Sequence, residues 1–410
     1  MSKRVVVTGM GAVTPLGKNC STFWENIKKG TCGIDYITIM NTDNFKVKVA
    51  GEVKDFKPEE FFDKREARKH DRYSQFALIA AEEAVKNSAL DFNEIDKDRI
   101  GVLVGSGIGG LGTMEREYRK MVEKDTTKVS PYLVPMMIGN MAAGNIAIKY
   151  QAKGPCLTVV TACATGTNSI GEAFEMIKAD RADVMIAGGA ESPITEVSLA
   201  GFTALSALSL SEDPGRASLP FDKNRGGFVI GEGAGVLILE ELNHALSRKA
   251  TIYGEVVGYG TTCDAYHMTQ PDSDGPKKAM ELAMKEADIN PGDISYINAH
   301  GTGTIFNDKV ETEAIKKAFG EKAYSIPVSS TKSMTGHLLG AAGAIESIVC
   351  LKAMEEGVIP PTIGLTEPDQ QCDLNYVPGK AQRAALKYTM SNSLGFGGHN
   401  GTLVFKKWEE

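Results

Sequence analysis

The chain has 410 residues, of which 42% are hydrophobic and 24% are charged, and it contains 44 glycines. This length and composition are typical of a globular protein with two or three domains or one large layered α/β unit, and they exclude a disordered or fibrous chain. The formal net charge of −7 argues against general nucleic-acid binding, which needs a basic face.

The start of the chain, MSKRVVVTG, contains only a short apolar run before a glycine. Signal peptides and membrane spans need much longer apolar segments, so we expect a cytoplasmic protein without membrane insertion. The seven cysteines are scattered and form no CxxC pair. A disulfide framework and a structural zinc site are therefore not expected.

Short β-branched segments alternate with helical segments in the first part of the chain. Strands are predicted at residues 5–8, 100–104, 158–161 and 182–187, and helices at 73–90 and after residue 165. The second helix places Ile170, Ala173, Phe174 and Ile177 on one face, at helical spacing. The segment 182–187, ADVMIA, is typical of a strand buried on both faces.

The same pattern restarts after about residue 250. Strands are predicted at IYGEVVGYG, at 294–299 and at 328–330, followed by a helix with an apolar side and two closing strands. We therefore predict two similar α/β halves, residues 1–250 and 251–410, with mainly parallel sheets covered by helices. Such sheets carry their sites at the carboxyl ends of the strands.

Cys163 follows the predicted strand 158–161 at the start of a helix. Unpaired N–H groups and the helix dipole there favour the thiolate and lower the pKa of a cysteine. Most free cysteines are simply small buried residues. Here the neighbours Ala162, Ala164 and Gly166 leave room for a substrate, so we predict that Cys163 is a nucleophile.

His300 and His337 lie in loops of small residues beside predicted strand ends, and Lys332 precedes the second one. A cysteine hydrolase needs one histidine, whereas two histidines and a lysine near a cysteine favour stabilisation of an enolate oxygen. The loop GFGGHN at 395–400 offers backbone N–H groups for an oxyanion hole, or is only a hairpin turn.

Two further segments have competing interpretations. Residues 107–112 match GxGxxG after a strand, which would fit an NAD-type oxidoreductase, but no acidic residue follows at the end of a next strand. Lys64, Arg65, Arg68 and Lys69 form a basic segment in an acidic protein. This segment is either a solvated helix face or a docking surface for an acidic partner.

Nine segments, in this order, resemble the β-ketoacyl-[acyl carrier protein] synthases, and most closely the type II synthases of bacterial fatty acid synthesis. They are VVVTGMGAVTPLG, TACATGTNSIGEAF, ADVMIAGGAES, GFTALSALS, PFDKNRGGFVIGEGAG, DAYHMT, NAHGTGT, KSMTGHLLGAAGAIE and SNSLGFGGHN. The resemblance extends over essentially the whole chain. It implies a thiolase-like fold of five layers, α-β-α-β-α, with two pseudo-duplicated halves in a homodimer.

The activity implied is an acyltransferase reaction, the decarboxylative Claisen condensation of fatty acid elongation. An acyl group on the cysteine reacts with malonyl-carrier protein to give a 3-oxoacyl-carrier protein and CO2. The partner is an acyl carrier protein with its phosphopantetheine arm, and neither a metal nor an organic cofactor is required. A polyketide-type ketosynthase and a non-condensing subunit that only sets chain length remain alternatives.

The resemblance also assigns residues to roles. Cys163 is the acylated nucleophile, and His300 and His337 serve decarboxylation and hold the enolate oxygen. The other implied positions are Lys332 paired with Glu346, Phe396 as a gate whose N–H completes the oxyanion hole, Thr302 and Thr304 on the pantetheine arm, Thr269 as a further substrate contact, Ile108 and Phe202 in the acyl tunnel, and Asp308 as structural support. Relatives commonly have Pro-Leu where this chain has Ile305 and Phe306, and Thr where it has His399.

Overall fold

The computed structural model describes residues 3–409 and is built around a ten-stranded sheet. The sheet strands are β1 (Val5–Val13), β4 (Ile100–Gly105), β5 (Cys156–Leu157), β6 (Val184–Glu191), β7 (Gly233–Glu241), β8 (Gly254–Cys263), β9 (Ile294–Asn298), β10 (Val328–Ser329), β13 (Tyr388–Gly395) and β14 (His399–Lys406). Two small sheets pair β2 (Asp35–Tyr36) with β3 (Val49–Ala50) and β11 (Val358–Ile359) with β12 (Gln382–Arg383).

The helices cover the outer faces of the two halves of this sheet, and two of them lie between the halves. They are α1 (Cys20–Lys29), α2 (Lys64–Ala67), α3 (Arg72–Ser88), α4 (Leu111–Glu123), α5 (Leu133–Met137), α6 (Met141–Tyr150), α7 (Thr165–Lys178), α8 (Glu196–Ala204), α9 (Leu242–Ser247), α10 (Asp274–Glu286), α11 (Ile305–Phe319), α12 (Lys332–Thr335) and α13 (Ala342–Glu356). Among residues 3–409, no helix combines the length and the apolarity that a membrane crossing needs.

The large sheet consists of two five-stranded halves with the same topology. The strand order is β10-β9-β13-β14-β8 in one half and β1-β7-β6-β4-β5 in the other. In each half the outer pairs are parallel (β4 with β5 and β6; β9 with β10 and β13) and the inner pairs are antiparallel. The prediction of mainly parallel sheets is therefore wrong, because each half returns through an antiparallel β7 or β14.

The first strand of each half packs against a helix in the same way. A Cβ atom on Gly11 of β1 would lie 1.9 Å from the carbonyl oxygen of Ala80 in α3, and one on Gly260 of β8 would lie 1.9 Å from that of Ala279 in α10. Only glycine allows so close an approach of strand and helix. The two halves therefore share, besides their topology, the need for glycine where the first strand contacts a helix.

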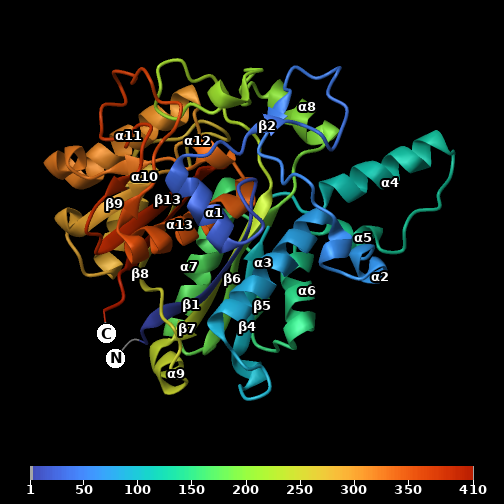
Figure 1. Ribbon diagram of the computed structural model, residues 1–410, viewed down its shortest axis with the longest axis horizontal. Coiled ribbons are helices and arrows are strands. Elements are labelled where there is room, and N and C mark those ends of the chain that lie inside the picture. Colours follow the sequence, from blue (N-terminus) through green and yellow to red (C-terminus); the bar gives the residue numbers. More distant parts are fainter. Residues whose placement is uncertain (1–2, 410) are drawn as a thin grey trace.

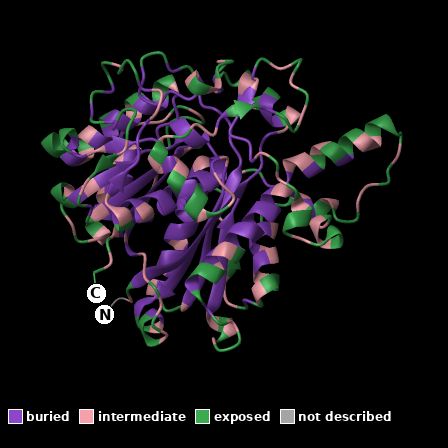
Figure 2. Cartoon of the chain, in the orientation of Figure 1, coloured by how far each residue is buried: buried purple, intermediate pink, exposed green. Residues whose placement is uncertain are grey.

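Helices α7 and α13 form the central layer, between the two halves of the sheet, and most of their residues are buried (Figures 1 and 2). Helices α3 and α6 cover the outer face of one half, and α10 and α11 that of the other (Figure 1). The result is the predicted five-layer α-β-α-β-α arrangement. The starts of α7 and α13 lie at the same end of the sheet as the carboxyl ends of β6 and β13.

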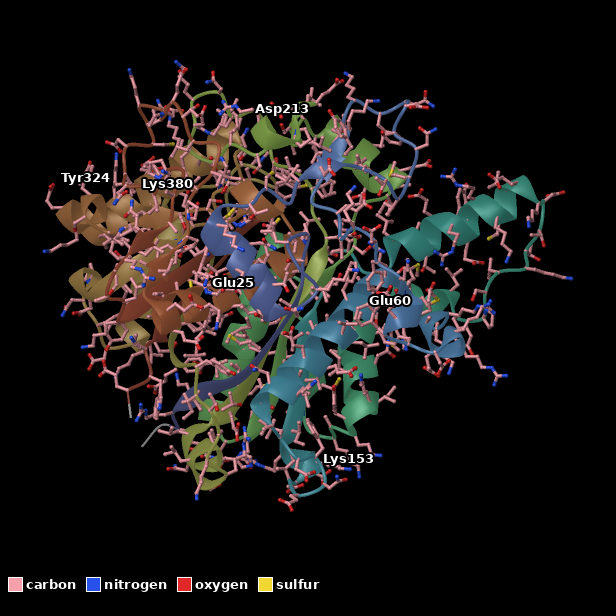
Figure 3. The ribbon with its side chains drawn as sticks, in the orientation of Figure 1. Glu25, Glu60, Lys153, Asp213, Tyr324 and Lys380 are labelled. Atoms are coloured by element: carbon pink, nitrogen blue, oxygen red, sulfur yellow. The ribbon has the colours of Figure 1, made fainter. Side chains whose placement is uncertain are left out.

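Polar side chains project from the surface on all visible sides, as Figure 3 shows for Lys153 on the first half and for Tyr324 and Lys380 on the second. Helix α4 projects from the body of the molecule (Figure 1). Its residues Met114, Tyr118 and Val122, spaced at i, i+4 and i+8, are exposed. An apolar stripe of this kind on one helix face is typical of a surface that packs against another element.

Candidate active site

Three reactive side chains from different parts of the chain meet in one cavity of about 330 Å³. The sulfur of Cys163 and the nearest ring nitrogens of His300 and His337 all lie within 4.8 Å of one another. The two imidazole rings are nearly perpendicular, at 86°, with centroids 5.2 Å apart, and both are buried. The sequence prediction that these three residues converge agrees with this geometry.

Cys163 lies in a sharp turn between the segment after β5 and helix α7. The preceding residue, Ala162, has a left-handed backbone with φ of 49°, and the turn continues as the 3-10 helix Ala162–Ala164. Left-handed backbone is unfavourable for a residue with a Cβ atom, so the surrounding packing must hold it. One such contact is at Gly395, where a Cβ atom would lie 2.6 Å from the Thr161 carbonyl oxygen.

Burial dominates the ionisation of Cys163. It raises the pKa of the thiol to about 12, although the charge of Lys332 and the backbone N–H groups of Phe396 and Cys163 lower it. The expectation of a lowered pKa is therefore wrong for this pocket, because loss of water outweighs the favourable field at the start of α7. The thiol is neutral near pH 7 and must give up its proton when it attacks.

Both histidines are neutral in the same environment. Burial and the charge of Lys332 hold the pKa of His300 and of His337 well below the usual value for histidine. A neutral imidazole carries one N–H donor and one acceptor nitrogen, so each ring can donate a hydrogen bond or take a proton. The ring of Phe228 packs edge-on against His337, with centroids 5.3 Å apart.

Lys332, whose charge acts on both histidines, forms a buried ion pair. Its Nζ lies 2.5 Å from Oε1 of Glu346, and both side chains are almost fully buried. Burial raises the pKa of Glu346 to about 7, and the neighbouring ammonium lowers it. This is the pairing that the sequence resemblance implied.

The loop that carries His300 is held by two carboxylates of α11. Glu311 accepts hydrogen bonds from the N–H groups of His300 and Gly301, each at 2.8 Å, and Asp308 accepts from those of Phe221 and Gly303. The family resemblance implies a supporting position for Asp308 but gives no position to Glu311. Its signal is the i, i+3 spacing from Asp308, which puts both carboxylates on one face of the helix.

The remaining predicted substrate contacts divide into two groups. Five of them line the same cavity as Cys163, His300 and His337, namely Phe202, Thr269, Thr302, Thr304 and Phe396. Ile108 does not line it, and the side chain of this residue is 39% exposed. Two residues that differ from those common in relatives, Ile305 and Phe306, are 58% and 63% exposed at the mouth of the cavity.

The GxGxxG segment is already occupied by a protein carboxylate. The N–H groups of Gly107 and Ile108 donate to the buried side chain of Glu191, at 2.8 and 3.1 Å. These are the groups that would face a pyrophosphate in a dinucleotide site. The geometry therefore argues against the NAD-type alternative.

The basic segment is a short exposed helix. Lys64, Arg65 and Arg68 are exposed, and among the described residues none of them has a carboxylate within ion-pair distance. Lys69 is paired with Glu66 at 2.5 Å. The side chains available to bind an acidic partner are thus mainly those of Lys64, Arg65 and Arg68.

Comparison with known proteins places these features in a family. The chain matches the models "Beta-ketoacyl synthase, N-terminal domain" over residues 2–245 and "Beta-ketoacyl synthase, C-terminal domain" over residues 253–366. It is 53% identical to 3-oxoacyl-[acyl-carrier-protein] synthase 2 of Staphylococcus aureus strain COL over 410 residues, which is 100% of this chain and 99% of the relative. The corresponding synthase of Synechocystis is 50% identical, with 99% of both chains covered.

Solved structures of ketosynthases are also similar to this chain over essentially its whole length. A ketosynthase from a type II polyketide system, determined with its acyl carrier protein and bound to a hexaketide, superposes with a TM-score of 0.92 at 37% identity, covering 100% of both chains. A β-ketoacyl synthase from Burkholderia phymatum superposes with a TM-score of 0.93 at 36% identity, covering 99% of this chain and 100% of that one.

Proposed function

The chain belongs to the β-ketoacyl synthase family, and from that premise we propose that it condenses an acyl group held on Cys163 with malonyl-[acyl carrier protein]. The products are a 3-oxoacyl-carrier protein, two carbons longer, and CO2, as in fatty acid chain elongation. The observation that carries the proposal is the meeting of one sulfur and two imidazoles within 4.8 Å in a single cavity.

The first half-reaction transfers the acyl group to the enzyme. The Cys163 sulfur attacks the thioester carbon and gives its proton to a neighbouring imidazole, since the thiol is neutral beforehand. The N–H groups of Cys163 and Phe396 stabilise the oxyanion. The bond from the carbonyl carbon to the pantetheine sulfur then breaks, and the carrier leaves as a free thiol that takes up the proton.

The second half-reaction forms the new carbon–carbon bond. Malonyl-carrier protein loses CO2, and the electron pair of the broken bond produces an enolate thioester, so no strong base is needed. Neutral His300 and His337 donate hydrogen bonds to the enolate oxygen. The enolate carbon attacks the acyl carbon on Cys163, the carbon–sulfur bond breaks, and the released thiolate takes a proton from a neighbouring imidazole, which water then reprotonates. Exclusion of water protects the acyl-enzyme from hydrolysis.

The nucleophile assignment is tested by replacement. Cys163→Ala should remove all acylation by acyl-carrier thioesters, detected as the mass of the intact protein, while the far-ultraviolet circular dichroism stays unchanged. Cys20→Ala, which changes a partly buried cysteine at the start of α1, is the control and should be acylated normally. A Cys163→Ala protein that still condenses would refute the mechanism.

Two alternatives remain within the family. The likeness to the polyketide ketosynthase favours a second candidate, in which successive malonyl units are added without reduction. Incubation with malonyl-carrier protein and acyl donors of graded length, followed by product mass, separates single elongation from a poly-β-keto chain. Acylation of Cys163 would in turn exclude a non-condensing subunit.

We propose an acyl carrier protein as the partner and a cytoplasmic location. The pantetheine arm would enter past Thr302, Thr304 and Thr269, and the acidic carrier would dock on the basic segment around α2. Changing Arg65, Arg68 and Lys69 to Glu should raise KM for the carrier protein and reduce its salt dependence. Unchanged values would show that the segment is only a solvated surface.

We also propose that the protein is a homodimer. Within each subunit, we place the boundary between the two halves near residue 250, between α9 and β8. Strand β5 is an edge strand, and Leu157, Val160 and Ile148 beside it are exposed and apolar. A second copy on this edge would also cover Ile108 and complete the acyl tunnel. Light scattering should give a dimer, and Leu157→Lys a monomer; a monomeric parent protein would contradict the proposal.

A further inference from the structure

Each half of the molecule contains the same 3-10 turn directly before its central helix. In the first half, Ala162 has φ of 49° and opens the 3-10 turn Ala162–Ala164 before α7. In the second half, Leu339 has φ of 46° and opens the 3-10 turn Leu339–Ala341 before α13. The middle residue is Cys163 in the first turn and Gly340 in the second. Gly340 is therefore the internal counterpart of the nucleophile.

Each turn also faces the end of the third strand of the other half. The Cys163 turn lies against the end of β13, where a Cβ atom on Gly395 would be 3.2 Å from the Cys163 nitrogen. The Gly340 turn lies against the end of β6, which holds the same place in its half-sheet. That strand ends in Glu191, whose Oε2 accepts a hydrogen bond from the Gly340 N–H at 2.9 Å.

The Glu191 carboxylate is fully buried and surrounded by donors. Oε1 accepts from the Ser106 hydroxyl at 2.7 Å and the Ile108 N–H at 3.1 Å, and Oε2 from the N–H groups of Gly107 at 2.8 Å and Gly340 at 2.9 Å. A backbone N–H can only donate, so both oxygens must act as acceptors. Burial raises the pKa of this carboxyl, and these four donors oppose that effect.

We propose that Glu191 is a built-in anion that permanently occupies the N–H of Gly340, the counterpart of the Cys163 N–H in the oxyanion hole, and so acts as a positioning residue. Its carboxylate joins the 106–109 loop, which carries Ile108, to Gly340, three positions after His337. The loop that carries the predicted tunnel residue Ile108 and the segment that follows His337 are thereby fixed to one group. The copy holds no second nucleophile, since a Cβ atom on Gly340 would lie 2.7 Å from Oε2 and 2.6 Å from the Gly107 nitrogen.

This inference rests on the proposed function for its first test. Glu191→Gln places an amide NH2 against two N–H or O–H donors. We expect the rate of Cys163 acylation to fall for long acyl-carrier thioesters by a factor at least tenfold larger than for a four-carbon thioester. In Glu191→Ala, formate should fill the vacated hole and raise acylation at least fivefold, whereas formamide should not. Glu52→Ala, which removes another buried carboxylate, is the control and should not respond to formate.

A second readout does not depend on the natural substrate. The Glu191 charge disfavours the Cys163 thiolate, so Glu191→Ala should be alkylated by iodoacetamide several-fold faster, and formate should restore the slower rate. If no acyl thioester labels the parent protein, the proposed function fails while this comparison still decides the role of Glu191. If formate changes neither the acylation nor the alkylation of Glu191→Ala, the proposed role of Glu191 is overturned.

If neither Glu191 variant folds, Ser106→Ala removes one of the four donors and leaves the carboxylate in place. We then expect acylation by long donors to fall several-fold relative to the four-carbon donor. A chain-length profile identical to that of the parent protein would overturn the proposal.

Discussion

The buried ion pair between Lys332 and Glu346 offers a quantitative test of the site. Lys332→Met keeps the apolar stem of the side chain but leaves Glu346 without its cation. Removing one partner of a buried pair costs about 3–5 kcal/mol of unfolding free energy, because the remaining carboxyl must either stay charged without a cation or take up a proton. We expect a loss in this range at pH 8.

The loss should depend on pH with a defined sign. The pKa of Glu346 in the folded protein, about 7, is already above its ordinary value, and Lys332 is one of the groups that lower it. In the variant the folded pKa is higher still. A carboxyl whose folded pKa is raised contributes stability that is fully present below its unfolded pKa and is lost as pH rises through the folded pKa. The unfolding free energy then falls by about 1.4 kcal/mol per pH unit in that window.

The deficit of the variant relative to the parent protein should therefore grow by about 1 kcal/mol or more between pH 6 and pH 8. Urea unfolding followed by circular dichroism at both pH values measures it. Lys149→Met is the matched control: Lys149 also lies 2.5 Å from a carboxylate, Glu82, but the two side chains are 36% and 63% exposed. Its effect should stay below about 1 kcal/mol. A deficit for Lys332→Met that is equally small, or equal at both pH values, would refute the reasoning.

Three further outcomes follow from the ionisation and geometry of the site. Because the pKa of Cys163 is about 12, its alkylation by iodoacetamide should accelerate about tenfold per pH unit from pH 7 to 10, and a plateau near pH 8 would show a lowered pKa instead. Because the pKa values of His300 and His337 lie well below 6.5, condensation should survive a fall from pH 8 to 6.5; loss of activity in that interval would contradict neutral imidazole donors. His300→Ala and His337→Ala should each keep self-acylation, measured by mass, but lose condensation by about 100-fold or more, and full elongation by either variant would remove the enolate role.

The sequence predicted those features that depend on local pattern. Helix α3 and the strands β1, β4, β6 and β9 fall within a few residues of their expected places, and the loops with Cys163, His300 and His337 do meet. Strand β7 was not predicted, because a short apolar run bounded by glycine and charged residues fits a buried helix as well as a strand. The antiparallel returns of each half depend on pairing between distant segments.

The features that no local pattern could give share a physical cause, which is contact between segments far apart in the sequence. The pKa of Cys163 depends on how much water the second half of the chain removes from the pocket, which no pattern around residue 163 contains. The place of Ile108 depends on the carboxylate of Glu191, some eighty positions away. Glu311 was overlooked because its role is fixed by backbone donors in a folded loop.

The junction between the half-sheets is short. Strands β1 and β8 pair only through Val5 with Val256, Val6 with Glu255 and Val7 with Gly254. Until the ribosome has added the second half, this edge of β1 is unpaired and the apolar faces of α7 that later contact α13 have no cover. Nascent chains that stop near residue 250 should thus aggregate or recruit chaperones, and a split protein should regain solubility only when both fragments are made together.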